Sequence, residues 1–403
     1  MTAPGDALRE GFTTGTAAAA AGMAALQRIL EGHVPPAVSV PLPPFTETPH
    51  GPRPAGRLTI PVLEGNLLAA PTASADAPAG LPDSTGWPDF QDGTGHAALA
   101  APTGLAAWAV VEKDGGDDPD ATHKAHIVAT VRLCADTPAI RLEGGQGVGR
   151  VTLPGLPVPV GEAAINPVPQ AQIRHALREV AAAYGYRGGL HVVISVPDGA
   201  RLARHTFNPR LGIVGGISIL GTQGTVRPYS HDAWKATIVQ GMNVAEATGC
   251  ASLCMTTGRR SERLLMDKYP QFPPQAFVQV ADFAEFSLRE AGLRPFEHLV
   301  WGCFFGKLVK LAQGHASTHA HDADLDFSLL SRWCAEAGAA RAADMAHCVT
   351  AGHALDTLLD GPGGLDAVRA VAQRAAHVAQ RFSGRPVRIH VFHIQGTELV
   401  RNS

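Results

Sequence analysis

The chain has 403 residues, of which 45% are hydrophobic and 17% charged, and its formal net charge is −3. A length of this size predicts two domains, because a single core rarely extends that far. The near-neutral balance argues against a nucleic-acid-binding protein, which usually presents a basic face. It leaves room for a small anionic ligand held by a few local cations.

Neither the cysteines nor the apolar segments suggest secretion or a membrane. The six cysteines follow no disulfide or metal-ligand spacing, and we expect Cys250 and Cys254 to be buried free thiols. No signal-peptide pattern opens the chain, and no apolar run is long enough to cross a bilayer. We therefore expect a cytoplasmic protein that binds neither membrane nor nucleic acid.

The first expected element is a helix within residues 9–30, REGFTTGTAAAAAGMAALQRIL. An alanine run followed by apolar side chains favours a helix, and Thr16 is expected to cap it. Hydroxyls beside a helix N-terminus also suit a carboxylate or phosphate, which makes Thr13, Thr14 and Thr16 candidate ligand contacts. The alternative, that these threonines only cap the helix, agrees equally well with the spacing.

Two less regular stretches follow. Residues 35–60 are rich in proline and contain VSVPLP and RLTIPV on either side of a turn, as expected of strands at a sheet edge. Residues 68–105 are rich in Ala, Pro, Gly, Thr and Asp and show little periodicity. They predict a surface insertion.

An acidic loop, DGGDDPDATH at residues 114–123, separates predicted strands at 107–113 and 125–133. Carboxylates this close raise one another's pKa, which is one way to make a general base, so Asp118 and Asp120 are candidate proton acceptors. The loop lacks the alternating acidic spacing of a calcium site. The competing interpretation is a solvated turn whose Asp side chains bind local amides.

The next stretch contains Gly144, Gly145, Gly147 and Gly149, followed by Arg150. These glycines predict a mobile loop and not a dinucleotide fingerprint, because no helix follows them. Farther on, Asn166 precedes an amphipathic helix at residues 170–185. Its core face is expected to contain Ile173, Ala176, Leu177 and Val180.

From residue 189 onward, strands alternate with helices. Apolar strands are expected at 190–196, 250–255, 298–304 and 387–394, and the last three end near glycine turns followed by polar or cationic residues. This alternation is typical of a parallel α/β sheet, whose ligands lie off the carboxyl ends of the strands. We therefore predict an α+β domain over residues 1–188 and a mostly parallel α/β domain over residues 189–403.

The central run at residues 205–230 reads HTFNPRLGIVGGISILGTQGTVRPYS. Glycines at strand ends allow close approach of a ligand to the main chain, and amides with nearby hydroxyls can hold an anion. A tight turn is the simpler explanation for any single glycine. The whole run favours a ligand loop formed by Gly215, Gly216, Ser218, Gly221, Thr222 and Gly224.

The segment at residues 306–319 also offers polar groups. Lys307 stands at a helix start, where it suits an anion as well as it suits solvent. His315 and His319 have the i, i+4 spacing of a metal pair, but the expected helix ends at Gly314 and no third ligand is evident. We therefore expect no metal site there, and a polar loop that contacts a ligand or itself.

Six ordered blocks together resemble the CbiD family, the cobalt-precorrin-5B C1-methyltransferases of anaerobic cobalamin biosynthesis. The blocks are LREGFTTGTAAAAA, VVEKDGGDDPDATH, VGEAAINPVP, NPRLGIVGGISILGTQGTVRPYS, TTGRRSE and GKLVKLAQGHASTH, and they extend over nearly the whole chain. The chain departs from the family at the 68–105 insertion, at His123–Lys124 and at Cys303–Phe304–Phe305. The resemblance implies a first domain similar to ribosomal protein S5 domain 2 and a second of α/β type.

The resemblance also implies roles for the candidate residues. S-adenosylmethionine would donate the methyl group, and cobalt would be carried by the substrate and not by the protein. Transient contact with neighbouring enzymes of the pathway is a further expectation. For the donor site we expect the 215–224 loop with Thr257, Gly258 and Glu262, the last contacting the ribose hydroxyls. For the carboxylate arms of the corrin precursor we expect Thr13, Thr14, Thr16, Arg150, Asn166, Arg259, Arg260, Lys307, His315 and His319.

Two other functions compete with methyl transfer. A non-catalytic corrinoid-binding protein would need the same anion contacts but would bind no methyl donor. A nucleotide-dependent phosphotransferase is suggested by Gly306–Lys307, but the chain lacks the G-x-x-x-x-G-K-[ST] run.

Overall fold

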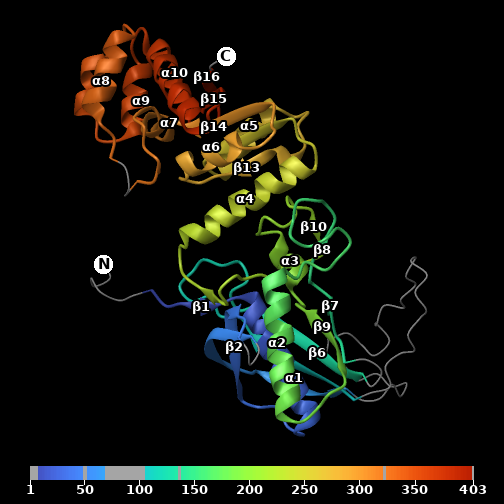
Figure 1. The fold of residues 1–403 in the computed structure, drawn as a ribbon. Coiled ribbons are helices and arrows are strands. Elements are labelled where there is room, and N and C mark those ends of the chain that lie inside the picture. Colours follow the sequence, from blue (N-terminus) through green and yellow to red (C-terminus); the bar gives the residue numbers. More distant parts are fainter. Residues whose placement is uncertain (1–7, 49–51, 69–104, 135–137, 321–323, 402–403) are drawn as a thin grey trace. The chain divides into compact units, whose positions relative to one another are not determined.

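The computed structural model describes residues 8–48, 52–68, 105–134, 138–320 and 324–401. The chain forms two compact units, each with its own core (Figure 1). Unit 1 comprises residues 1–153 and 157–230, and unit 2 comprises residues 231–403 with the short segment 154–156. The units therefore divide after Ser230, and not at residue 188 as the sequence suggested.

Unit 1 is built on a five-stranded sheet with the order β4-β5-β6-β9-β7. The strands are β4 (Glu64–Leu68), β5 (Ala106–Glu112), β6 (His126–Cys134), β9 (Gly189–Ser195) and β7 (Ile140–Gly144). All neighbours are antiparallel except β7 and β9. The misplaced boundary follows from β9, which was expected to open the second domain. Its apolar sequence suits either sheet, and its pairing with β6 keeps it in unit 1.

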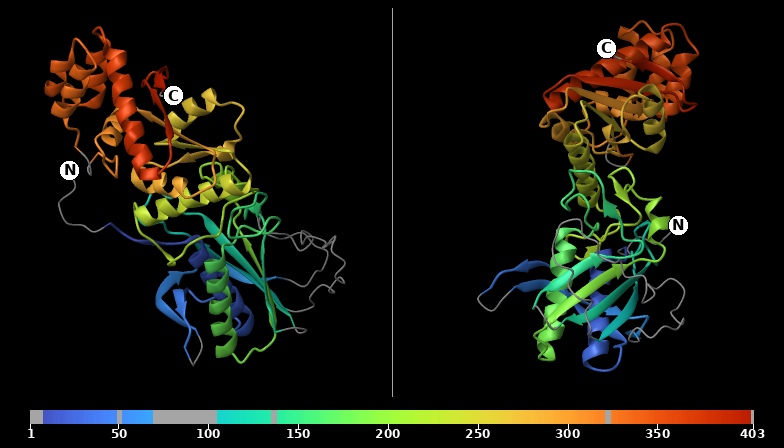
Figure 2. Two further views of the ribbon diagram at one scale, coloured as in Figure 1. Left: turned by 45° about the horizontal axis from the view of Figure 1, so that its top comes forward. Right: turned by 90° about the vertical axis from the view of Figure 1, so that its right-hand side faces the viewer.

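Two helices, α1 (Thr14–Leu30) and α2 (Pro167–Ala183), pack against each other and cover this sheet (Figure 2). The alanines of α1 are fully buried because small side chains let the helix fit between the sheet and α2. The expected core face of α2 is confirmed: Ile173, Ala176, Leu177 and Val180 are all buried. The cap of α1 was assigned wrongly. Thr13, not Thr16, is the N-cap, and its hydroxyl accepts a hydrogen bond from the Thr16 amide at 3.2 Å.

The expected proline-rich strands form the antiparallel pair β2 (Ala37–Thr46) and β3 (Arg53–Pro61), of which β2 packs against α2. The two-residue strands β1 (Gly11–Phe12) and β11 (Thr225–Val226) pair with each other, as do β8 (Arg150–Val151) and β10 (Ile213–Val214). A short helix, α3 (Gly199–Ala203), follows β9. Of the expected insertion, residues 69–104 lie outside the described residues; the flanking Leu68 and Ala106 are paired neighbours in β4 and β5.

The glycine segment at 144–149 is tightly packed, although the sequence suggested a mobile loop. A side chain at Gly216 or at Gly199 would stand 2.0 Å from the carbonyl oxygen of Gly147. The Ile217 amide donates to that same oxygen at 3.0 Å. Glycine is needed at these positions because three backbone segments touch there.

Unit 2 contains the sheet β13-β12-β14-β15-β16. Its strands are β13 (Phe277–Gln279), β12 (Ser252–Thr256), β14 (His298–Phe304), β15 (Val387–Phe392) and β16 (Glu398–Arg401). The first four run parallel and β16 is antiparallel to β15, so the expected mostly parallel sheet is confirmed. Mixed α/β architecture thus describes the chain as a whole.

Helices pack on both faces of the second sheet. Side chains of α4 (His231–Ala247), α6 (Ala284–Gly292), α7 (Phe305–Ala312) and α10 (Gly364–Ser383) share one core with Trp301 and Ile389. Leu265 of α5 (Arg259–Lys268) packs into a second core with Cys254 and Phe392. The larger core extends into α8 (Phe327–Glu336) and α9 (Ala351–Leu359). Two short 3₁₀ segments lie at Pro274–Ala276 and Ala342–His347. No helix among the described residues is long and apolar enough to span a membrane.

Candidate functional site

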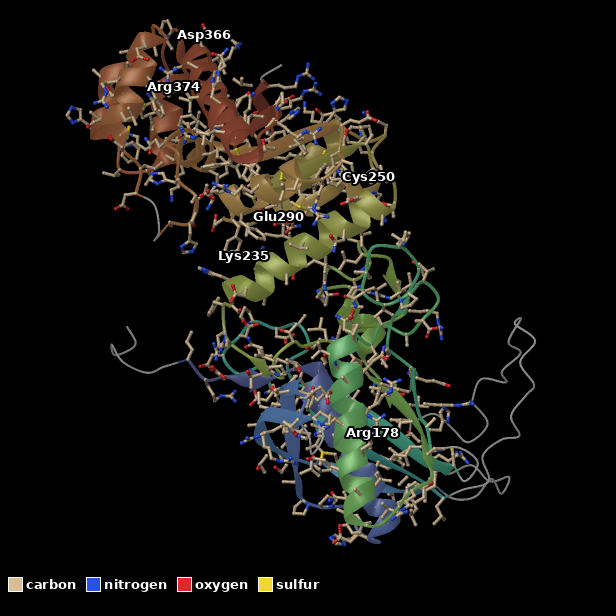
Figure 3. The ribbon with its side chains drawn as sticks, in the orientation of Figure 1. Arg178, Lys235, Cys250, Glu290, Asp366 and Arg374 are labelled. Atoms are coloured by element: carbon tan, nitrogen blue, oxygen red, sulfur yellow. The ribbon has the colours of Figure 1, made fainter. Side chains whose placement is uncertain are left out.

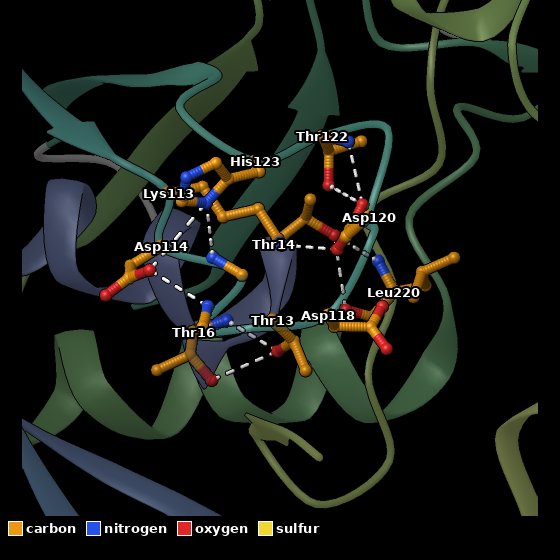
Figure 4. A network of polar contacts seen from close by, with 12 residues as sticks. Thr13, Thr14, Thr16, Lys113, Asp114, Asp118, Asp120, Thr122, His123 and Leu220 are labelled. Carbon is orange, nitrogen blue, oxygen red and sulfur yellow. Dashed lines mark hydrogen bonds and ion pairs between the residues drawn. The ribbon is translucent and has the colours of Figure 1, made fainter. Parts of the chain in front are cut away.

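Three segments of unit 1 that are far apart in sequence meet at one place, which we call the junction: residues 9–16, 113–123 and 218–229. The amides of Phe12, Thr13 and Gly15 donate to the carbonyl oxygens of Asp114, Gly224 and Leu220 at 2.8, 3.0 and 3.1 Å. The segments correspond to three of the blocks that the sequence singled out. Figure 4 shows the polar contacts of this region.

The threonines at the junction bind the protein itself. Thr13, Thr14 and Thr16 are at most 5% exposed. The Thr14 hydroxyl accepts from the Leu220 amide at 2.9 Å, and the Thr16 hydroxyl donates to the Gly224 carbonyl at 2.7 Å. The capping alternative holds for Thr13, whereas Thr14 and Thr16 bond a segment distant in sequence. Their role is to hold the 218–224 segment in place, and their hydroxyls are not turned to an outside ligand.

Two carboxylates of the acidic loop form ion pairs with Lys113 and Arg9, which the sequence interpretation did not anticipate. The ammonium of Lys113, only 1% exposed, pairs with the Asp120 carboxylate at 2.5 Å, and Thr122 donates to Asp120 through its amide and its hydroxyl, both at 2.7 Å. Burial by itself raises the pKa of Asp120. The charge of Lys113 and these hydrogen bonds outweigh it and lower that pKa below its ordinary value.

The neighbouring carboxylate follows the same rule. Arg9 binds Asp114 through two guanidinium nitrogens, one of them at 3.0 Å, and this hydrogen bonding lowers the pKa of Asp114. Crowding was expected to raise these pKa values; for Asp114 and Asp120 that expectation is wrong, because each carboxylate has its own cation. A carboxylate held in its ionised form is a weak proton acceptor, which does not suit Asp120 as a general base. Asp118 is half-buried and accepts the Tyr229 amide at 2.9 Å.

The lowered pKa of Asp120 predicts a specific pH dependence. A carboxyl whose pKa is lower in the folded state stabilises the fold above its ordinary value of 3.8, and this contribution is lost as the pH falls through the folded pKa. The difference in unfolding free energy between the wild type and Asp120→Asn should therefore be constant near neutral pH and shrink below about 3.8. Urea denaturation at a series of pH values measures it, and a difference that stays constant down to pH 2 would contradict the ion-pair assignment.

The glycines of the 215–224 run have different reasons to be glycine. At three positions a side chain would come within 2.7 Å of another residue. It would meet the Gly147 carbonyl oxygen at Gly216, Thr13 at Gly221 and Leu42 at Gly224. Tight packing explains these three. Gly215, by contrast, has φ of +85° and nothing within 4 Å of the position that a side chain would occupy. Ser218 is buried and its hydroxyl donates to Asn208 at 3.3 Å.

An exposed turn remains at the end of this run. Thr222 and Gln223 are exposed, and among the described residues no hydrogen bond is donated by the amides of Gly221, Thr222 or Gln223. Successive backbone amides in a turn are a known type of anion-binding group. These exposed amides suit an anionic ligand better than the buried threonine hydroxyls of the junction do.

Two further residues assigned to substrate contacts lie in unit 1. Arg150 is exposed and donates to the Gly161 carbonyl, while β8 holds it opposite Val214, one residue before Gly215. Asn166 is the N-cap of α2 and makes no side-chain capping bond. Its backbone amide donates to the Ile219 carbonyl oxygen at 2.9 Å. The structure thus brings both next to the 215–219 segment.

The remaining candidates lie in unit 2, at the carboxyl edge of the parallel sheet. Thr257 and Gly258 connect β12 to α5, and no atom lies within 4 Å of the position that a Gly258 side chain would take. Glu262 is only 3% exposed and accepts from the Gln279 amide group at 2.7 Å. A buried carboxylate already bound in this way does not fit the expected contact with ribose hydroxyls.

Lys307 is also bound within the protein. It pairs with Asp282 and donates to the Thr318 carbonyl at 2.8 Å, and Thr318 in turn donates to Asp282 at 3.0 Å. His315 and His319 follow the end of α7 and are not on a helix, so their spacing has no metal-pair geometry. Arg259 and Arg260 are both exposed; Arg260 donates to the Ile394 carbonyl and lies over the Phe304 ring.

The side chains of unit 2 offer little nucleophilic chemistry. All six cysteines of the chain are free; Cys254 is buried as expected, whereas Cys250 is only half-buried, so that the expectation is wrong for Cys250. Burial raises the pKa of the Cys254 and Cys303 thiols to about 12, which keeps them protonated. Within the described parts of the chain, no three His, Cys, Asp or Glu side chains are grouped to hold a metal ion.

One polar network was missed by the sequence analysis. His390, 1% exposed, contacts the Tyr269 hydroxyl through Nε2 at 2.9 Å and Glu398 through Nδ1 at 2.6 Å, and Lys268 pairs with Glu398 at 2.9 Å. Burial lowers the pKa of His390. A histidine inside the apolar strand VRIHVFHI was the available signal. The network ties β16 to α5.

Comparison with known proteins places these features in a family. The CbiD family model matches residues 1–50 and 97–228, and the CbiD C-terminal domain model matches residues 317–403. A protein named cobalt-precorrin-5B C(1)-methyltransferase from Nitratidesulfovibrio vulgaris is 52% identical over 98% of this chain and 92% of its own length. One with the same name from Geobacillus kaustophilus is 43% identical over 83% of this chain and 78% of its own.

A crystal structure of a cobalamin biosynthesis protein (cbiD) from Archaeoglobus fulgidus is 24% identical, covers 74% of this chain and 78% of that one, and has a TM-score of 0.35. The family model passes over residues 51–96, within which most of the expected insertion lies. Matched family models over both the beginning and the end of the chain, with 52% identity over nearly its full length, lead to one conclusion. The chain belongs to the CbiD family.

Proposed function

We propose that this chain is a cobalt-precorrin-5B C(1)-methyltransferase, which moves a methyl group from S-adenosylmethionine to ring carbon C1 of its substrate in cobalamin biosynthesis. The observation that carries the proposal is the 52% identity to a relative of that name over 98% of this chain. The cobalt belongs to the substrate, and the protein needs no metal of its own for a methyl displacement.

The direct experiment incubates the purified chain with methyl-labelled S-adenosylmethionine and cobalt-precorrin-5B. We expect one label per macrocycle and a mass increase of one methylene unit. An unchanged macrocycle, under conditions where the Nitratidesulfovibrio relative methylates it, would refute the proposal. Binding of the corrin without transfer would instead support the alternative, a non-catalytic corrinoid-binding protein.

For the methyl donor, the exposed turn of unit 1 is the best-fitting seat. The donor carries a carboxylate, and the unpaired amides of Gly221, Thr222 and Gln223 suit such a group. Gly215, open to solvent, stays a proposed contact of this seat. Thr257 and Gly258 belong to unit 2 and stay a separate proposal for a donor contact. Glu262 is unsuited to contact the ribose because it is buried and bound by Gln279.

A charge placed on this turn tests the seat. Thr222→Asp should weaken binding of S-adenosylhomocysteine about tenfold, because a second carboxylate repels that of the ligand at about 1.4 kcal/mol. Thr222→Asn, of the same shape and without charge, should change binding less than about twofold. Calorimetry measures both. Equal affinity for the two variants would place the carboxylate elsewhere.

Catalysis by this chain would depend mainly on alignment. Methyl transfer from a sulfonium needs no acid for the leaving group, and holding the two reactants in line supplies effective concentrations on the order of 10⁵ M. Arg150 of unit 1, which is exposed, is proposed to bind a carboxylate arm of the substrate, and Asn166 to contact the substrate beside the 215–219 segment. Arg259 of unit 2, also exposed, is a separate proposal for binding such an arm. Asp118, the half-buried acid of the loop, is the proposed group for holding a proton near the ring.

An arrangement similar to ribosomal protein S5 domain 2 is proposed for unit 1, where two helices on one sheet support it. Transient contacts with neighbouring enzymes of the pathway are proposed for delivery of the substrate and removal of the product.

A further inference from the structure

A groove in unit 1 contains none of the candidate site residues that the sequence analysis named. It has a volume of about 430 Å³, within the range of small-molecule sites, and it lies between α2 and the β2–β3 pair. Its walls include Phe45, Gln170, Arg174, His175 and Arg178. Figure 3 labels Arg178, which projects from α2.

The groove follows one stripe of α2. Gln170, Arg174 and Arg178 recur every four residues and therefore share a face, while Ile173, Leu177 and Val180 are buried in the core. On the other side, the Phe45 ring of β2 lies 4.6 Å from the His175 ring, centroid to centroid. The result is a site with an aromatic wall and two guanidinium groups.

The two arginines of this stripe have no ion-pair partner among the residues that the structure describes. Arg174 donates to the neutral Gln170 side chain at 2.9 Å, and among the described residues neither Arg174 nor Arg178 forms an ion pair. Glu179 is bound by both terminal nitrogens of Arg57, at 2.9 and 3.1 Å. The acid on the rim, Glu47, is exposed and forms no ion pair with any described residue.

Placing two such cations together is unfavourable. Burial, and then the nearby charge of Arg178, lowers the pKa of Arg174. Like charges four residues apart also destabilise a helix. An anion bound between them would remove this repulsion, and guanidinium groups match carboxylates with two parallel hydrogen bonds.

The groove is also connected to the junction. The start of α2 is held by a hydrogen bond from the backbone amide of Asn166 to the Ile219 carbonyl oxygen, and the Pro169 ring packs against Gly15. Deeper in the helix, Gln172 donates to the Thr16 hydroxyl at 3.1 Å and to the Pro41 carbonyl at 3.0 Å. The wall that carries the arginines is thereby fixed to the segment proposed to hold the methyl donor.

From these contacts we propose that the groove binds carboxylate arms of the corrin substrate, with Arg174 and Arg178 as the ion partners and Phe45 and His175 as the aromatic wall. The inference rests on the proposed function, which supplies a flat ligand with several acidic arms. It adds a specificity site on α2 to the contacts expected from the sequence.

Kinetics of single-arginine variants test the groove. Arg174→Ala and Arg178→Ala should each raise the KM for cobalt-precorrin-5B about tenfold, with kcat and the KM for S-adenosylmethionine within twofold of the wild type. The KM of Arg178→Lys should lie between those of the wild type and Arg178→Ala, because the charge stays and the two-pronged hydrogen bond is lost. Arg187→Ala, an exposed arginine just beyond α2 and outside the groove, is the matched control and should leave all three constants unchanged.

A second ligand separates carboxylate binding from a general loss of affinity. The same corrin with its arms converted to amides should bind the wild type more weakly, yet bind wild type and Arg178→Ala equally. If the variants lose affinity equally for both ligands, or if their KM for the acidic corrin stays within twofold of the wild type, the groove is not the carboxylate site. A wild type that transfers no methyl group would refute the proposed function instead, and direct corrin binding by absorbance would still test the groove.

Discussion

Asp120→Asn should lower the unfolding free energy of unit 1 by about 3 kcal/mol. The substitution keeps the shape and the hydrogen bonds from Thr122, but it leaves the ammonium of Lys113, 1% exposed, without a charge partner. Removing one partner of a buried ion pair costs about 3–5 kcal/mol, and we take the lower end because the Asp120 side chain is still 23% exposed. Hydrogen exchange of the β6 amides in the full chain, followed in urea, measures this loss.

A double substitution separates the ion pair from any other role of Asp120. Lys113→Met with Asp120→Asn removes the uncompensated charge, and should recover more than half of the lost stability, because neutral pairs of similar volume are tolerated where single charges are not. Asp117→Asn is the control: Asp117 is exposed, and its contact with the Arg9 amide can be kept by an amide oxygen. If Asp120→Asn were as stable as the wild type, the short distance to Lys113 would have no energetic meaning.

The same ion pair shows where sequence interpretation reached its limit. The acidic loop was recognisable, and so were the strands on either side of it. The charge state of its carboxylates was not, because it depends on Arg9, distant in sequence, and on Lys113, which lies in the expected strand but turns inward. Local patterns reveal which residues are present, but a pKa is set by neighbours in space.

For the fold, too, the elements were predictable from local patterns, but their partners in space were not. Periodicity correctly indicated α2, the β2–β3 pair and the parallel order of β12, β14 and β15. It misplaced β9, since an apolar strand carries no label of the sheet to which it belongs. The groove beside Arg174 and Arg178 was invisible for a related reason: the amphipathic pattern identified the buried face of α2, and its polar face gave no sign that β2 stands opposite.

The glycine pair at 215–216 allows two causes of glycine preference to be separated by experiment. At Gly216 an alanine methyl would stand 2.0 Å from the Gly147 carbonyl oxygen and 2.8 Å from the Gly149 amide nitrogen. Both are backbone atoms that cannot turn aside, so segments of the chain must move apart. We expect Gly216→Ala to cost about 3 kcal/mol or more, at the upper end for overpacked interiors.

Gly215→Ala is the matched substitution one residue earlier. Its methyl would meet no atom within 4 Å, and the cost would come only from the backbone, since φ of +85° is unfavourable for alanine by about 1 kcal/mol. Urea denaturation of the two variants should therefore differ by about 2 kcal/mol or more. If both lost the same small amount, close packing would not explain Gly216, and its glycine would have to be attributed to a ligand that approaches the main chain. If the predicted difference is found, the ligand-binding part of the 215–224 run contracts to Gly215 and the turn at Gly221–Gln223, where the backbone is open to solvent.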